Sequence, residues 1–129
     1  MYALLLAYNA DESSVLRLVL QRAGFATKVT TDIKQAIQEW DANPLDLILF
    51  SFQNEPPDEV IQEIRSKTEV PLIVISQPLG EDAHVNLLEV GVDLVVFRPF
   101  SARLLISQLR GLLRRASGIS VFNLPGFRG

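Results

Sequence analysis

Cysteine is absent from the 129-residue chain, and histidine occurs once, as His84. The missing thiols exclude a disulfide framework, a thiolate zinc site and a cysteine nucleophile. We expect His84 to be a surface residue, neither a metal ligand nor a base. The formal net charge of −3 gives no sign of a nucleic-acid-binding surface in this segment. Residues 1–7 are too short an apolar run for a signal peptide or a membrane span. We therefore expect a cytoplasmic protein without membrane contact.

The chain has a regular alternation of short apolar runs and amphipathic stretches. The apolar runs predict strands at residues 2–7, 26–30, 47–50, 72–75 and 92–97. The stretches that follow them have helical spacing, at about residues 9–24, 33–40, 60–64, 81–89 and 105–115. Trp40 follows this spacing and is expected to pack. The (βα)5 order predicts an α/β fold, a doubly wound five-stranded parallel sheet in a three-layer sandwich.

The segment after the first predicted strand decides between function classes. Asn9 is expected to cap the first helix, with Glu12 closing a capping box. Asp11 and Glu12 also complement the dipole of that helix. Residues 7–12 contain no glycine, so this segment has neither the G-x-G-x-x-G motif that binds dinucleotides nor a P-loop. A flavodoxin-like enzyme remains an alternative, but we expect no catalytic residue, metal or cofactor.

Five short patterns, taken in their order and spacing, resemble the CheY-like receiver domains of bacterial response regulators over about residues 2–116. They are Arg22–Phe25, Pro44–Leu47, Val70–Ser76, Glu89–Asp93 and Arg98–Ser101. The last pattern leads into a helix ending at residues 112–115, which is similar to the winged-helix, OmpR/PhoB-like transcription regulators. The resemblance implies a receiver domain at 1–116, with 117–129 as a linker or the start of a missing DNA-binding domain.

The resemblance also implies a phosphorylation pocket, and this sequence departs from it. By position, the pocket residues are Ala7, Tyr8, Ser51, Ser76 and Arg98, and Val95 stands at the switch aromatic. Ser51 replaces the acceptor aspartate and cannot form an acyl phosphate. No carboxylate remains at Ala7 or Tyr8 to hold Mg²⁺. Arg98 replaces a lysine, and only Ser76 keeps the expected residue type. We interpret the pocket as degenerate.

Several roles stay open on sequence alone. The ring of Tyr8 either fills the empty pocket and hydrogen-bonds through its hydroxyl, or it faces solvent. Arg98 either binds an anion, pairs with a nearby carboxylate, or faces solvent. Asp11 and Glu12 become the acidic pair if the first helix is one turn shorter. The arginines of the last helix are expected to form a solvated face: Arg103, Arg110, Arg114 and Arg115.

The resemblance finally implies a homodimer interface, formed by the predicted helix at 81–89, the fifth strand and the last helix. Its residues by position are Asn86, Leu87, Asp93, Leu94, Leu104, Gln108 and Arg115. Asp93 and Arg115 match a cross-subunit ion pair, while apolar side chains replace other charges. The sequence thus predicts a phosphorylation-independent receiver domain, a dimerisation and protein-interaction module of a DNA-binding transcription regulator. A stand-alone adaptor that docks on a kinase or another signalling partner is the alternative.

Overall fold

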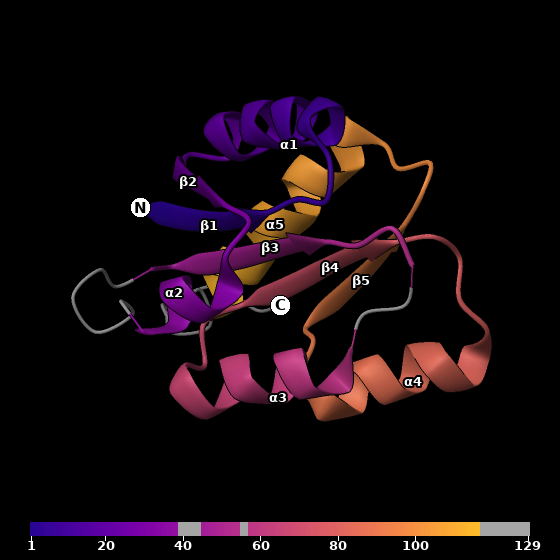
Figure 1. Cartoon of the computed structure of the whole chain (residues 1–129). Helices are drawn as coiled ribbons and strands as arrows, with labels where there is room; N and C mark the ends of the chain where they lie inside the picture. The colour runs from indigo at the N-terminus through magenta and orange to yellow at the C-terminus, as the bar shows by residue number, and fades with distance from the viewer. Residues whose placement is uncertain (39–44, 55–56, 117–129) are drawn as a thin grey trace, which may run out of the picture.

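The computed structural model describes residues 1–38, 45–54 and 57–116, which form one α/β unit (Figure 1). The expectations for Trp40 and for residues 117–129 lie outside this range. The strands are β1 (Tyr2–Leu6), β2 (Ala26–Thr30), β3 (Leu47–Ser51), β4 (Leu72–Ser76) and β5 (Leu94–Phe97). The helices are α1 (Ala10–Arg22), α2 (Ile33–Gln38), α3 (Asp58–Lys67), α4 (Glu81–Val90) and α5 (Ala102–Ala116).

The five strands form a single parallel sheet in the order β2-β1-β3-β4-β5. The predicted doubly wound fold is confirmed. The near-continuous apolar runs of β1, β3 and β4 are explained by burial on both faces, which is usual for central parallel strands. Among the described residues, no helix is both long and apolar enough to cross a membrane.

Side-chain alternation along the strands divides the core into two layers. Ala3 and Leu5 of β1 pack with buried residues of α1 and α5, whereas Leu4 and Leu6 pack with buried residues of α3 and α4. Figure 1 shows the same division, with α1 above the sheet, α5 behind it, and α3 and α4 below it. Because the strands are parallel, their carboxyl ends meet at one edge, on the right in Figure 1.

The start of α1 confirms one half of the predicted capping box and corrects the other. Asn9 Oδ1 accepts a hydrogen bond from the Glu12 backbone N–H at 2.8 Å, so Asn9 is the N-cap. The Glu12 carboxylate does not close the box. It turns away from the helix end and bonds to Ser51 and Arg98, because the buried guanidinium needs an anionic partner.

Candidate functional site

The degenerate pocket lies where the strands end, and three elements bring their polar side chains to it. Ser51 is the last residue of β3 and only 2% exposed. Arg98 directly follows β5, and Glu12 lies in the first turn of α1. Ser51 and Arg98 were predicted here from position. Glu12 was predicted to close the capping box of α1 or, with a shorter helix, to be half of an acidic pair, and the structure places its carboxylate at the centre of this cluster.

The three side chains form a closed hydrogen-bonded cluster. Arg98 donates from Nε to Glu12 Oε2 at 2.6 Å and from Nη2 to Glu12 Oε1 at 2.8 Å. This fork-to-carboxylate geometry is the strong, bidentate form of an ion pair. Arg98 Nη2 also donates to Ser51 Oγ at 2.9 Å, and the Ser51 hydroxyl donates to Glu12 Oε1. Of the alternatives left open for Arg98, pairing with a carboxylate is the one observed.

Burial makes this ion pair more than a surface contact. The side chains of Arg98 and Glu12 are 11% and 12% exposed. Burial raises the pKa of the Glu12 carboxyl, but the hydrogen bonds from Arg98 and Ser51, together with the charge of Arg98, outweigh it and leave the pKa below its ordinary value of 4.5. The hydrogen bond to Glu12 raises the pKa of Arg98, against the opposing effect of burial. Both groups are therefore ionised at neutral pH.

Tyr8 lies beside the cluster without filling the pocket. Its ring centroid is 4.9 Å from Arg98 Cζ, a cation–π distance, and the residue is 42% exposed. With Ala7, Ser51 and the stacked rings of Phe50 and Phe52, it lines a hollow of about 310 Å³. The side chain thus combines the two alternatives, since its ring contacts the pocket arginine while part of it faces solvent.

The donors present do not fit the divalent cation that the family resemblance implies. Mg²⁺ takes oxygen ligands, normally including one or two carboxylates that are free to coordinate it. In this pocket, the acidic residue among the described ones is Glu12, and both of its oxygens already accept hydrogen bonds from Arg98. Nowhere in the described ranges do three His, Asp or Glu side chains converge as metal ligands.

The two remaining predicted positions of the site lie outside the cluster. Ser76 is fully buried, and its hydroxyl donates to the backbone oxygen of Gln77 at 2.8 Å. Val95 packs half-buried against the α3/α4 layer of the core. The aromatic contact in this region is instead between Phe97 of β5 and His84 of α4, edge to face at 5.0 Å. His84 is half-buried, so its expected surface position holds only in part.

The predicted dimer face is corrected on α4. Leu87 is 1% exposed and belongs to the core, so it cannot add an apolar surface. Asn86 donates to both carboxylate oxygens of Asp58, at 3.1 and 2.9 Å, and so faces α3. Helical geometry explains both positions. One side of α4, with Leu87, packs on the sheet, and the adjacent side, with Asn86, packs on α3. The exposed apolar residues of α4 are Val85 and Leu88, each 44% exposed.

The β5 and α5 part of the predicted face does come together. Leu94, Gln108 and Arg115 line one shallow hollow of about 380 Å³ with Asp93, and Leu104 on α5 is 57% exposed. Asp93 has partners within the chain, which sequence position did not suggest. Its Oδ2 accepts from Arg65 Nη2 at 2.5 Å and from the Leu72 backbone N–H at 2.8 Å.

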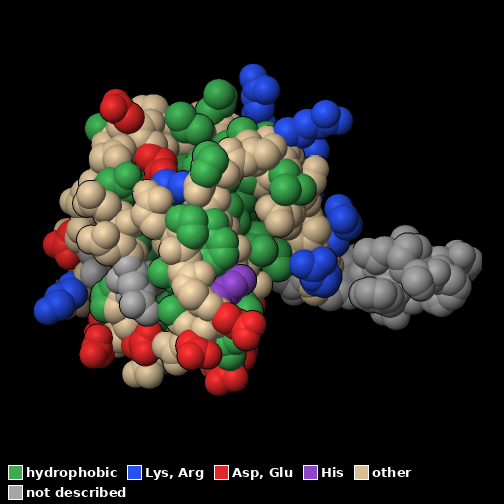
Figure 2. All heavy atoms as spheres, turned by 90° about the vertical axis from the view of Figure 1, so that its right-hand side faces the viewer, with side chains coloured by type: hydrophobic (Ala, Val, Ile, Leu, Met, Phe, Trp, Pro, Cys, Tyr) green, Lys and Arg blue, Asp and Glu red, His purple; other side chains and the backbone are tan. Residues whose placement is uncertain are grey.

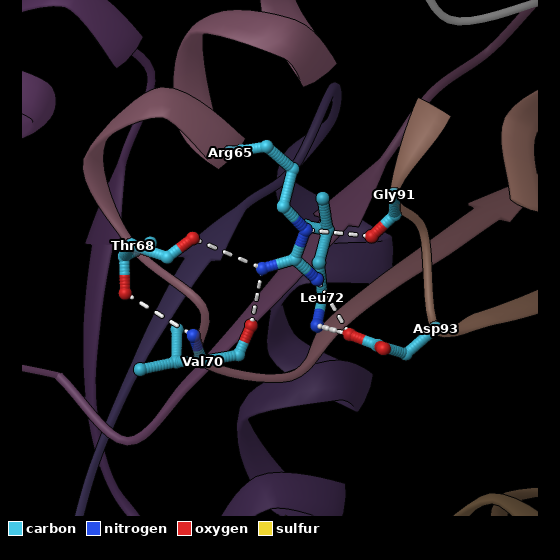
Figure 3. A network of polar contacts seen from close by, with 6 residues as sticks. All are labelled: Arg65, Thr68, Val70, Leu72, Gly91 and Asp93. Carbon is cyan, nitrogen blue, oxygen red and sulfur yellow. Dashed lines mark hydrogen bonds and ion pairs between the residues drawn. The ribbon is translucent and has the colours of Figure 1, made fainter. Parts of the chain in front are cut away.

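Figure 3 shows the network around Arg65, which links α3 to the ends of its neighbours. Arg65 donates from Nε to the Gly91 carbonyl at 2.6 Å and from Nη1 to the carbonyls of Val70 and Thr68, at 2.7 and 3.3 Å. Any cross-subunit pairing of Asp93 with Arg115 would therefore share a carboxylate that Arg65 already binds.

The fold is that of a CheY-like receiver domain, with an arginine–glutamate pair where its parallel strands end. Solved structures agree on the fold: an orphan response regulator from Helicobacter pylori, HP1043, superimposes with a TM-score of 0.76 at 23% identity, over 88% of this chain and 97% of that one. The sequence matches no protein-family model.

Two curated relatives are also similar to this chain in sequence. The chain is 34% identical over 110 residues to the sensory transduction protein RegX3 of Mycobacterium bovis, over 81% of this chain and 48% of RegX3. It is 33% identical over 118 residues to the transcriptional regulatory protein ResD of Bacillus subtilis, over 88% of this chain and 49% of ResD. The chain is thus a response-regulator receiver domain. It spans about half the length of these relatives.

Proposed function

We propose that this chain is a phosphorylation-independent receiver domain, which regulates by binding proteins and has no enzymatic activity. The observation that supports this is the cluster of Glu12, Ser51 and Arg98. A serine stands where an acceptor carboxylate would be, and its hydroxyl is hydrogen-bonded to both charged partners. Among the described residues, the carboxylate at this pocket is that of Glu12, and it is bound by a guanidinium. Phosphoryl transfer needs an acceptor and a cation that neutralises developing charge, and the cluster supplies neither.

The ion pair between Arg98 and Glu12 can hold the end of β5 in place without a phosphoryl group. It ties the end of β5 to the start of α1 and the end of β3, across 86 and 47 residues of sequence. A permanent link of this kind holds one arrangement of the β5 end without a signal. We therefore infer that the domain keeps a constitutive, partner-binding conformation.

We propose that the domain belongs to a cytoplasmic transcription regulator of the OmpR/PhoB type, with a DNA-binding domain beyond residue 129. ResD is described as a transcriptional regulatory protein and RegX3 as a sensory transduction protein, and both continue beyond the part that this chain matches. We further propose a homodimer through β5 and α5, with Leu94, Leu104, Gln108 and Arg115 at the contact. This segment would touch no nucleic acid itself.

The phosphorylation part is tested by incubating the domain with acetyl phosphate and Mg²⁺ and measuring the intact mass. We expect no adduct at Ser51 or elsewhere, because the carboxylate that accepts from the Ser51 hydroxyl, Glu12, is paired with Arg98 and has a lowered pKa, which makes it a weak base for activating a serine. A receiver domain with an intact aspartate serves as the positive control in the same buffer. A stoichiometric phosphoryl adduct would contradict the proposal, whether hydroxylamine removes it, as for an acyl phosphate, or leaves it, as for a serine phosphate.

A further inference from the structure

Three aromatic side chains surround the hollow at the carboxyl ends of the strands, and the proposed function does not use them. Phe50 and Phe52 stack on each other with their ring centroids 3.8 Å apart, and both are half-buried. The Tyr8 ring lines the same hollow and is 42% exposed. A large aromatic side chain left in contact with water forfeits part of its free energy of burial. Three such rings around one open hollow therefore indicate a binding site.

The hollow lies at the ends of β1, β2 and β3 and includes the point where the connections of the sheet diverge. The helix that follows β1, α1, packs on one face of the sheet, whereas the helix that follows β3, α3, packs on the opposite face. Since β1 and β3 are neighbours, the two connections open a crevice between their ends, which is the usual position of ligands in open α/β sheets. Figure 2 looks onto this edge of the sheet and shows hydrophobic side chains gathered near its centre.

The lining of the hollow carries no charge among its described residues. Besides the three rings, these residues are all neutral: Leu6, Ala7, Thr30, Thr31, Ser51 and Gln53. The guanidinium of Arg98 lies over the Tyr8 ring, but it is already paired with Glu12. A charged ligand would therefore leave water without gaining a free counter-charge, which is unfavourable.

We propose that this hollow binds a small, neutral, planar aromatic molecule. Its volume of about 310 Å³ lies at the lower end of the range for small-molecule sites, about 300–1,000 Å³. The ligand ring would stack on Tyr8 and Phe52, an arrangement that adds to the free energy of burial alone. The hydroxyl of Thr31 and the amide of Gln53, both on exposed residues at the rim, would bind a polar substituent of the ligand.

A ligand in this hollow would also reach the cluster of Glu12, Ser51 and Arg98. Ser51 lines the hollow and accepts a hydrogen bond from Arg98 Nη2 at 2.9 Å. Tyr8, on which the ligand would stack, has its ring centroid 4.9 Å from Arg98 Cζ. Occupation of the hollow would therefore favour one position of Arg98 and of the β5 end that precedes it.

The test uses 2-naphthol, a neutral bicyclic aromatic compound at pH 7, which is titrated into ¹⁵N-labelled residues 1–129 and followed by amide shifts in NMR spectra. We expect the backbone amides of Tyr8, Thr31 and Phe52 and the Nε–H of Arg98 to shift, with a Kd of about 0.1–1 mM for so small a ligand. The titration contains neither acetyl phosphate nor Mg²⁺, so its failure would leave the proposed loss of phosphorylation untouched.

Two variants and one matched control locate the site. Tyr8→Leu and Phe52→Leu should each weaken binding by about threefold to tenfold, because leucine keeps much of the apolar volume but offers no ring for stacking. Tyr2→Leu is the control. It makes the same replacement at the opposite end of β1, where Tyr2 is 61% exposed and does not line the hollow. The spectrum of each free variant shows whether its fold is intact.

Four outcomes would overturn the inference. Unchanged amides around the hollow at millimolar 2-naphthol would show that no such site exists. Equal weakening by Tyr2→Leu would place the binding elsewhere. Equally tight binding of 2-decalol, the saturated analogue, would show apolar contact without stacking, and tighter binding of 2-naphthoate would show a site for anions. Shifts confined to the hollow and to Arg98, which weaken in Tyr8→Leu and Phe52→Leu but not in Tyr2→Leu, support the proposal.

Discussion

At the scale of single residues, the pocket depends on Glu12. Arg98 is buried beside it, and the third guanidinium nitrogen, Nη1, has no hydrogen-bond partner among the described residues. Taking a charge out of water is costly unless a partner compensates it, and Glu12 supplies that compensation. The same pair sets the chemistry of Ser51, whose oxygen is held between the two charged groups. One glutamate therefore decides both stability and reactivity at this site.

We expect Glu12→Gln to lower the free energy of unfolding at pH 7 by about 1–3 kcal/mol, because Arg98 loses its counter-charge while staying buried. The folded-state pKa of Glu12 lies below its ordinary value of 4.5, so the ionised carboxylate stabilises the fold fully above that value. This contribution is lost as the pH falls through the lower, folded-state pKa. Urea denaturation from pH 7 to pH 3 should show the difference between wild type and variant shrinking.

The control for this experiment is Asp11→Asn, which removes an exposed carboxylate from the same helical turn. Its effect should stay within about 0.5 kcal/mol, as for ordinary surface substitutions. A cost of Glu12→Gln that does not change with pH would contradict the role of the ionised pair.

We expect Ser51→Asp alone not to restore phosphorylation. The new carboxylate would lie beside Glu12 and Arg98, and Arg98 would bind it before a cation could. Mg²⁺-dependent labelling by acetyl phosphate, followed by intact mass, should stay at background in the single variant. A second aspartate at Ala7 or Tyr8 should be required before any labelling appears. Robust labelling of Ser51→Asp by itself would mean that the metal site survives.

At the scale of elements, Arg65 holds the end of α3 against the end of α4 and the segments that precede β4 and β5. Its guanidinium satisfies carbonyls beyond the ends of α3 and α4 and before β4, which would otherwise lack partners. Gly91 ends α4 with a φ of +123°, and a Cβ there would lie 2.6 Å from Arg65 Cγ. The glycine therefore serves both the turn and the passage of the arginine stem.

We expect Arg65→Met to destabilise the domain by about 2 kcal/mol or more, because methionine keeps the apolar stem but leaves several carbonyls and Asp93 without their donor. Urea denaturation at pH 7 measures this. Lys67→Met, an exposed substitution at the end of the same helix, should change stability by less than about 0.5 kcal/mol. Equal effects of the two variants would show that the network contributes little.

At the scale of the whole molecule, we propose that a second copy binds at the edge formed by β5 and α5. A leucine fully buried at an interface contributes about 1.5–3 kcal/mol, whereas an exposed ion pair contributes about 0–1 kcal/mol. The free energy from burying Leu104 at the proposed interface therefore exceeds that of an exposed ion pair of the kind this face lacks.

We expect residues 1–129 to dimerise without phosphorylation and Leu104→Glu to abolish this in sedimentation velocity at micromolar concentration. Leu104→Glu is cleaner than Leu94→Arg, since Leu104 is 57% exposed while Leu94 packs partly on the core. Leu18→Glu, at a leucine of α1 that is 49% exposed, is the matched control and should leave the dimer intact. A wild-type monomer at high micromolar concentration, or a Leu104→Glu dimer of unchanged affinity, would contradict the proposed interface.

The sequence by itself determined the order of elements, and it has a serine at position 51, where the family resemblance implies an acceptor aspartate. Hydrophobic periodicity is local and the identity of a residue is read directly, so neither needs a structure. Only the tertiary structure decided which side chains meet. The family resemblance placed Leu87 at an exposed interface, but packing on the sheet buries Leu87 and leaves its neighbour Leu88 exposed. Glu12 and Arg98 are 86 residues apart, and no local pattern joins them. Their pairing follows from parallel strands ending at one edge, where a buried arginine must find a carboxylate.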